Sequence, residues 1–116
     1  IFASENDSNM IIEYENEEIK EFILHGTANG RPYSKWKSNK QLRKDLDKVM
    51  EILTLADNCC ILYTLKSLHY EQLKYDYDGR SSVRLGFKSK FRLIFTELEN
   101  GIKINILEIS EHYGDK

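Results

Sequence analysis

The spacing of hydrophobic positions changes part-way along the chain, which is 116 residues long. In the first half, apolar residues recur at intervals of four, three and four, with charged residues between them: Leu42, Leu46, Val49 and Leu53. This spacing places apolar side chains on one face of an α-helix. It predicts a helix from residue 33 to about residue 56. A shorter helix is predicted after Asn16, because this good N-cap residue is followed by acidic residues.

Beyond residue 80 the apolar residues alternate with polar ones, which is the pattern of strands with one buried face. Three such runs occur, at residues 82–88, 91–96 and 102–106. An Asn-Gly turn at Asn100 and Gly101 is expected to join the last two runs. Residues 88–90 are expected to turn the first pair. A further strand is predicted at residues 10–14, residues 25–32 read as a loop, and residues 57–70 fit a strand or an irregular segment equally.

The length and composition predict one domain with one core, since 41% of the residues are hydrophobic. No apolar run approaches the roughly 20 residues that span a bilayer, and no export leader is visible, so a cytoplasmic protein is expected. Residues 1–9 are polar and aperiodic. We expect them to be a disordered leader or a remnant of cloning ahead of a single domain of residues 10–116. Cys59 and Cys60 are adjacent, a spacing that favours neither a disulfide nor a zinc site.

The formal net charge of -2 hides an uneven distribution. Residues 1–21 carry seven acidic residues against one basic, which leaves 16 basic against 12 acidic in the rest. Between residues 79 and 95 there are five basic residues and no acidic one: Arg80, Arg84, Lys88, Lys90 and Arg92. The alternation of apolar and polar residues predicts that the side chains of Arg84, Lys88 and Arg92 point to the face of the sheet away from the helices. Such a cationic face suits a polyphosphate such as RNA.

Four short motifs follow one another in an order typical of a family of bacterial toxins: Leu73-Lys74, Gly79, Arg92-Leu93-Ile94-Phe95 and the ILEISEHY run at residues 106–113. With the helix pattern before them, they span nearly everything from Met10 onward. The chain therefore resembles the RelE/ParE toxin superfamily, and within it the HigB-like plasmid maintenance killer proteins. The resemblance implies a small α+β fold, with helices packed on one face of a curved, mainly antiparallel sheet.

The same resemblance implies a function. It points to a ribosome-dependent endoribonuclease, an mRNA interferase that cuts message and arrests translation and growth. A cognate helix-turn-helix antitoxin of the HigA-like kind would hold the toxin inactive, and no metal or cofactor is expected. The alternative within the same fold is a protein that cleaves no RNA, either a ParE-like gyrase poison or an inactive member that only binds its antitoxin.

Cleavage by attack of the RNA's own 2′-hydroxyl needs a base, cations that stabilise the phosphorane, and an acid for the leaving oxygen. Arg92 matches the arginine of the family's RLIF motif and is the first candidate for phosphate stabilisation, because a guanidinium grips two phosphate oxygens at once. Lys74 is the second candidate. His112 and Tyr113 are expected to transfer protons or to stack on a base. Relatives usually have tyrosine before histidine, so which of the two transfers protons stays open.

Four further cations are expected to hold the RNA backbone on the same face: Arg80, Arg84, Lys88 and Lys90.

Overall fold

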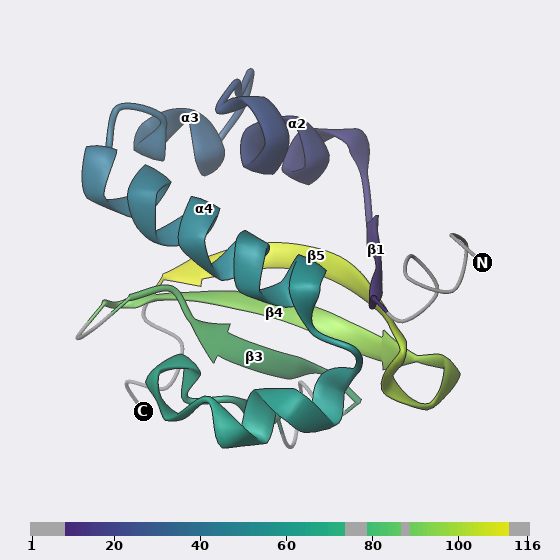
Figure 1. The fold of residues 1–116 in the computed structure, drawn as a ribbon. Helices are drawn as coiled ribbons and strands as arrows, with labels where there is room; N and C mark the ends of the chain where they lie inside the picture. Colours follow the sequence, from purple (N-terminus) through teal and green to yellow (C-terminus); the bar gives the residue numbers. More distant parts are fainter. Residues whose placement is uncertain (1–8, 74–78, 87–88, 112–116) are drawn as a thin grey trace.

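The computed structural model describes residues 9–73, 79–86 and 89–111 of the chain. Within these ranges, α2, α3 and α4 pack over one face of a five-stranded sheet (Figure 1). The strand order is β1-β5-β4-β3-β2, with β1 parallel to β5 and every other pair antiparallel. The predicted α+β fold, with helices on one face of a mainly antiparallel sheet, is confirmed.

The strands mostly follow the predicted alternation. Their bounds are β1 (Ile11–Tyr14), β2 (Glu71–Gln72), β3 (Ser81–Arg84), β4 (Phe91–Leu98) and β5 (Lys103–Glu111). The first run is shorter than predicted, because β3 ends at Arg84; residues 87 and 88 lie outside the described residues. The turn between β4 and β5 uses positive φ angles at Asn100 and Gly101, as the Asn-Gly pair predicts. The two-residue strand β2 was not predicted.

The prediction of one continuous helix over residues 33–56 is wrong. The structure has two helices there, α3 (Tyr33–Trp36) and α4 (Lys40–Leu55). Asn39 lies between them with extended backbone, and its side chain accepts a hydrogen bond from the Leu42 N–H at 3.0 Å. A capping side chain satisfies the first turn of a new helix, so the chain restarts at this point. The same device begins α2 (Glu17–His25), where Asn16 accepts from the Ile19 N–H, as predicted.

Residues 57–70, left open between two readings, form two 3-10 helices, η1 (Cys59–Thr64) and η2 (Lys66–Leu68). Leu62 and Leu68 are buried and tie this segment to the core. At His69 the backbone turns into the left-handed region, with φ +46°, and leads directly into β2. β2 is the last strand in the sheet order and forms its edge.

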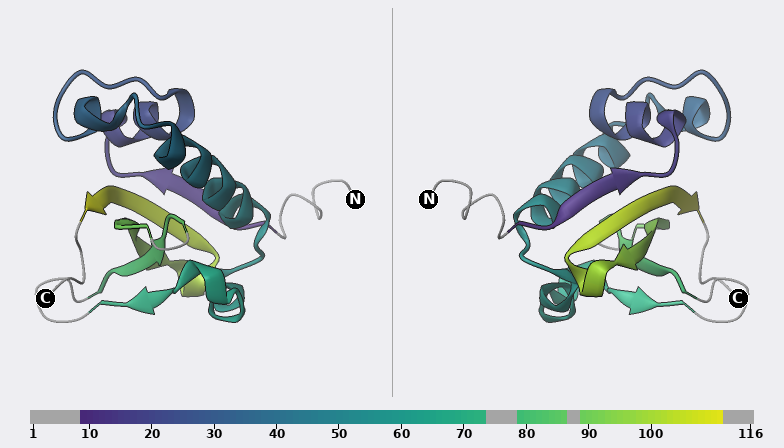
Figure 2. Two further views of the ribbon diagram at one scale, coloured as in Figure 1. Left: turned by 90° about the vertical axis from the view of Figure 1, so that its left-hand side faces the viewer. Right: turned by 90° about the vertical axis from the view of Figure 1, so that its right-hand side faces the viewer.

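The core lies between the helical layer and the sheet. The predicted apolar face of α4 is buried against strand residues Val83, Leu93, Phe95, Ile104 and Ile106. Arg43 of α4 also joins the helices, because its guanidinium donates to the carbonyls of Phe22 and Ile23 at the end of α2, at 2.8 and 2.6 Å. The turned views in Figure 2 show α2, α3 and α4 as one layer beside β1 and β5. Among the described residues no helix is both long enough and apolar enough to cross a membrane.

Candidate active site

Two arginines stand side by side on the sheet face away from the helices. Arg84 of β3 and Arg92 of β4 are direct cross-strand partners in the antiparallel register. Facing residues of such a pair point to the same side, while their neighbours Val83 and Leu93 point into the core. The alternation argument therefore places these two cations correctly.

The expected exposure of Arg92 is wrong, because its side chain is only 9% exposed. Its Nε donates to Ser82 Oγ at 2.9 Å, and its Nη2 donates to the His69 carbonyl at 2.6 Å. The same Nη2 lies 3.5 Å from Glu71 Oε1. The physical reason is the unpredicted turn and strand at residues 69–72, which lie alongside β3 and surround the guanidinium with acceptors. Arg92 is thus a cation held in a fixed orientation.

Glu71 is the functional candidate that sequence reasoning missed. It lies on β2 opposite Ser82, on the face that also carries Arg92, and its side chain is 55% exposed. A carboxylate that is open to solvent and next to a fixed guanidinium is suited to take a proton from a bound hydroxyl. A two-residue strand is too short for any periodicity, so the sequence offered no signal for this placement.

Arg84 differs from Arg92 in its contacts. It is half-buried, and no hydrogen bond or ion pair joins its side chain to another described residue. Two like charges directly opposite one another on a sheet repel, and the Glu71 carboxylate lies beside the Arg92 guanidinium. An anion placed over Arg84 and Arg92 would relieve this repulsion.

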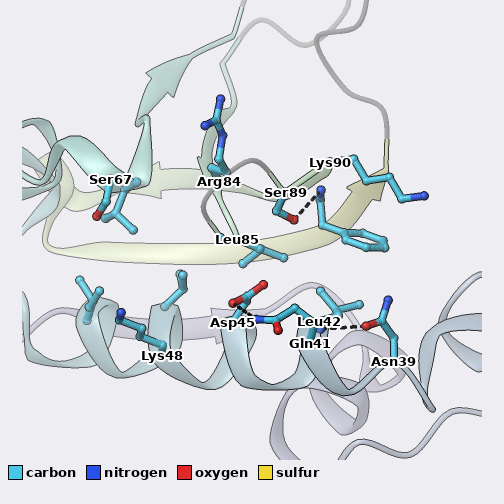
Figure 3. A pocket seen from close by; sticks show the side chains of 15 residues that line it. Asn39, Gln41, Leu42, Asp45, Lys48, Ser67, Arg84, Leu85, Ser89 and Lys90 are labelled. Carbon is cyan, nitrogen blue, oxygen red and sulfur yellow. Dashed lines mark hydrogen bonds between the residues drawn. The ribbon is translucent and has the colours of Figure 1, made fainter.

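Lys90 is not brought to the two arginines. Its Nζ lies 2.8 Å from Glu111 Oε2 at the end of β5, and 5.7 Å from the centre of the Phe91 ring. Figure 3 shows its side chain extending away from Arg84. Arg80 lies just before β3, where its carbonyl accepts from the Leu73 N–H at 2.8 Å. Four other predicted residues lie outside the described residues: Lys74, Lys88, His112 and Tyr113.

A cavity of about 550 Å³ separates α4 from the hairpin of β3 and β4. Both Arg84 and Leu85 line this cavity, and Figure 3 shows the Leu85 side chain pointing toward α4 and the Arg84 side chain pointing away from it. Asp45 reaches up to the hairpin, where a Cβ on Gly86 would lie 2.5 Å from Asp45 Oδ2. The glycine permits this close approach.

The described residues contain no group of His, Cys, Asp and Glu that could hold a metal ion. Both cysteines are free, and Cys59 is buried. Burial raises the pKa of the Cys59 thiol to about 12, the nearby charge of Glu97 adding to the effect. Because the thiolate is the nucleophilic form, Cys59 is unsuited to attack a substrate.

No protein-family model matches the chain, and no curated protein matches it. Solved structures do match it. The YoeB/ParE toxin from Agrobacterium tumefaciens superposes with a TM-score of 0.56 over 90% of this chain and 100% of its own, at 12% identity. A chain of the YoeB-YefM complex from Staphylococcus aureus gives 0.53 over 90% and 99%, at 17% identity. The chain has the fold of the YoeB/ParE toxins. The fold expected from the RelE/ParE resemblance is confirmed, and at these identities the likeness concerns the fold.

Proposed function

We propose that this chain is the toxin of a toxin–antitoxin system and that it cleaves messenger RNA in the ribosome. Three observations support the proposal: the fold shared with a YoeB/ParE toxin, the order of the RelE/ParE motifs, and the chemistry of the open sheet face. The observation that carries it is the Glu71 carboxylate 3.5 Å from the guanidinium of Arg92, with Arg84 directly across the strand pair.

The roles follow from what each group can do. Glu71 accepts the proton of the RNA 2′-hydroxyl, and the freed oxygen attacks the adjacent phosphorus. Arg92 and Arg84 face the charge that develops on the phosphorane oxygens. The bond to the 5′-oxygen breaks, leaving a 2′,3′-cyclic phosphate on one fragment and a 5′-hydroxyl on the other. We assign the proton for that leaving oxygen to His112 or Tyr113, and a supporting cation to Lys74.

The partners belong to the same proposal. An antitoxin is expected to bind the chain, of the HigA-like helix-turn-helix kind if the HigB-like motif order decides the subfamily. The staphylococcal neighbour was solved in complex with YefM. The ribosome would supply the message, with Arg80, Arg84 and Lys88 contacting its backbone. Lys90 would contribute only if RNA displaced it from Glu111.

The test is cleavage of message on purified ribosomes, mapped by primer extension, with growth arrest on expression as a second measure. Glu71→Gln is expected to lower the rate by about 10²-fold or more, because the base is lost while shape is kept. Arg92→Lys is expected to lose a comparable amount, since an ammonium cannot reproduce the guanidinium fork. Glu51→Gln, an exposed acid on α4, is the matched control and should cleave like the wild type.

Circular dichroism and thermal unfolding of each variant separate loss of chemistry from loss of fold, which matters for the buried Arg92. Wild-type protein that yields no cuts on programmed ribosomes would contradict the proposal. Full cleavage by Glu71→Gln would contradict the role of that carboxylate. Inhibition of purified DNA gyrase, retained by both variants, would instead support the ParE-like alternative.

A further inference from the structure

Strand β2 carries the proposed base, yet little in the sheet holds it. It consists of Glu71 and Gln72, both exposed, and it is the edge strand of the sheet. Its pairing with β3 involves only two residue pairs, extended by the Leu73 N–H bond to the Arg80 carbonyl. Such a short edge pairing contributes little stability by itself. A base that must act at a fixed place therefore needs another anchor.

The residue before Glu71 supplies that anchor on the opposite face. The Tyr70 hydroxyl donates to Glu97 Oε2 of β4 and lies 3.5 Å from Ser81 Oγ of β3. Ser81 Oγ donates to the same Glu97 oxygen at 2.7 Å. The Glu97 carboxylate thus joins the segment before β2 to strands β3 and β4.

The Tyr70 ring strengthens the same attachment. It makes an edge contact with Tyr63 of η1, with ring centres 4.5 Å apart, and lies 6.4 Å from the Phe95 ring of the core. Ser81 is buried, and Glu97 and Tyr70 are half-buried, so the cluster is partly shielded from water. Hydrogen bonds in such surroundings resist competition from solvent more than exposed ones do.

The two faces are coupled by strand geometry. Successive residues of an extended chain point to opposite sides, so fixing the Tyr70 side chain on the helix side fixes its neighbours toward Arg92. These neighbours are the His69 carbonyl, 2.6 Å from Arg92 Nη2, and the Glu71 carboxylate, 3.5 Å from it. The left-handed turn at His69 aims that carbonyl.

We propose that Tyr70, bonded to Glu97 and Ser81, is a positioning residue that holds β2 where Glu71 and the His69 carbonyl meet Arg92. We call these three residues the β2 anchor. Its role in catalysis rests on the proposed function, whereas its role in holding β2 does not. Tyr70 touches no reacting atom and acts only through its neighbours.

The first measurement needs no activity. Tyr70→Phe removes one hydroxyl and keeps the ring, and it is expected to speed hydrogen exchange of the Leu73 amide about tenfold by loosening β2. Amides within α4 should exchange as before. Tyr63→Phe is the matched control, because the Tyr63 hydroxyl bonds to no described residue. Glu97→Gln keeps an acceptor and should behave like the wild type, whereas Glu97→Ala should resemble Tyr70→Phe.

The second measurement is a double-mutant cycle in the cleavage assay. Tyr70→Phe is expected to lower kcat about tenfold with little change in KM, because the base is misplaced while RNA binding persists. In a Glu71→Gln background the same change should lower kcat no further. A general loss of stability would lower both backgrounds alike, so the cycle separates positioning from a structural role.

The outcomes separate the two proposals. Unchanged Leu73 exchange in Tyr70→Phe would overturn the β2 anchor, whatever the enzyme does. Faster exchange with unchanged kcat would overturn its link to catalysis. Wild-type protein that cleaves no RNA would refute the proposed function, while the exchange experiment would still decide whether Tyr70 holds β2.

Discussion

At the scale of single residues, the guanidinium of Arg92 is preorganised: its orientation is fixed before a ligand binds. Among the described residues, its acceptors are Ser82 of β3, the His69 carbonyl at the end of η2, and Glu71 of β2. A side chain with this much rotamer freedom loses it on folding, before any ligand arrives. When a phosphate binds to this already oriented guanidinium, the Arg92 side chain therefore loses no further conformational entropy.

Glu97 gives a prediction about pH at the same scale. Burial raises the pKa of Glu97 above its ordinary value of 4.5, and the hydrogen bond from Cys59 lowers it by less. The folded chain therefore keeps this proton to a higher pH than the unfolded chain does. The stability contributed is fully present below the unfolded pKa and is lost as pH rises through the folded pKa. Above about pH 4.5, the wild type should lose free energy of unfolding relative to Glu97→Gln.

Urea unfolding of the two proteins across this pH range measures the difference. Glu99→Gln, an exposed acid in the turn after β4, serves as the control and should follow the wild type. If the difference between wild type and Glu97→Gln stays flat, or if the wild type gains stability with rising pH, the burial argument for Glu97 is wrong.

At the scale of elements, Asn39 decides where α4 begins. Its side chain satisfies the Leu42 N–H, one of the free donors at the first turn. Asn39→Ala is expected to lower the free energy of unfolding by about 1 kcal/mol. Ser38→Ala, one residue earlier and exposed, is the matched control and should change it by less than about 0.5 kcal/mol. Denaturant titration with both variants checks this, and equal effects would argue against a capping role.

The elements that sequence reasoning found are those with one face on the core. The apolar spacing of α4 and the alternation of β5 each report a single buried side, and in the β3 run the apolar residues face the core, so the positions of these elements and the shared side of Arg84 and Arg92 could be predicted. β4 was harder, because it is central and Ile94 is buried on the face away from the helices. Periodicity does not reveal what covers that second face.

The elements that it missed are too short or too irregular to carry a period. The 3-10 helices at residues 59–68 look like a strand or a loop in sequence, and β2 has only two residues. Because β2 supplies Glu71 and helps to bury Arg92, missing it meant missing half of the candidate site. The break before α4 did have a signal, the Ser38-Asn39 pair, which the run of helical residues obscured.

At the scale of the whole molecule, the formal net charge of -2 means that attraction to RNA has to be local. For single-stranded RNA, each neutralised phosphate contributes about -0.7 to the slope of log K against log salt. Two phosphates, one each on Arg84 and Arg92, contribute about -1.4 to the expected slope, and contacts of Arg80 and Lys88 with the backbone add to it. Arg84→Ala should reduce that slope by about 0.7.

Fluorescence anisotropy with a labelled oligonucleotide at several salt concentrations measures these slopes for the isolated protein. Arg31→Ala, an exposed arginine in the loop before α3, is the control and should leave the slope unchanged. A slope insensitive to Arg84→Ala would place RNA elsewhere on the molecule.

The sheet topology also sets an order of events during synthesis. β5 lies between β1 and β4 although it is the latest of the five strands in the sequence, and Asn105 bonds to Glu15 across 90 residues. Most of a growing chain has therefore left the ribosomal tunnel while its sheet still lacks the strand that joins β1 to β4. The apolar residues of the nascent chain stay without their partners in the sheet until β5 emerges. We therefore expect the sheet to fold late and cooperatively, and not stepwise from the N-terminus.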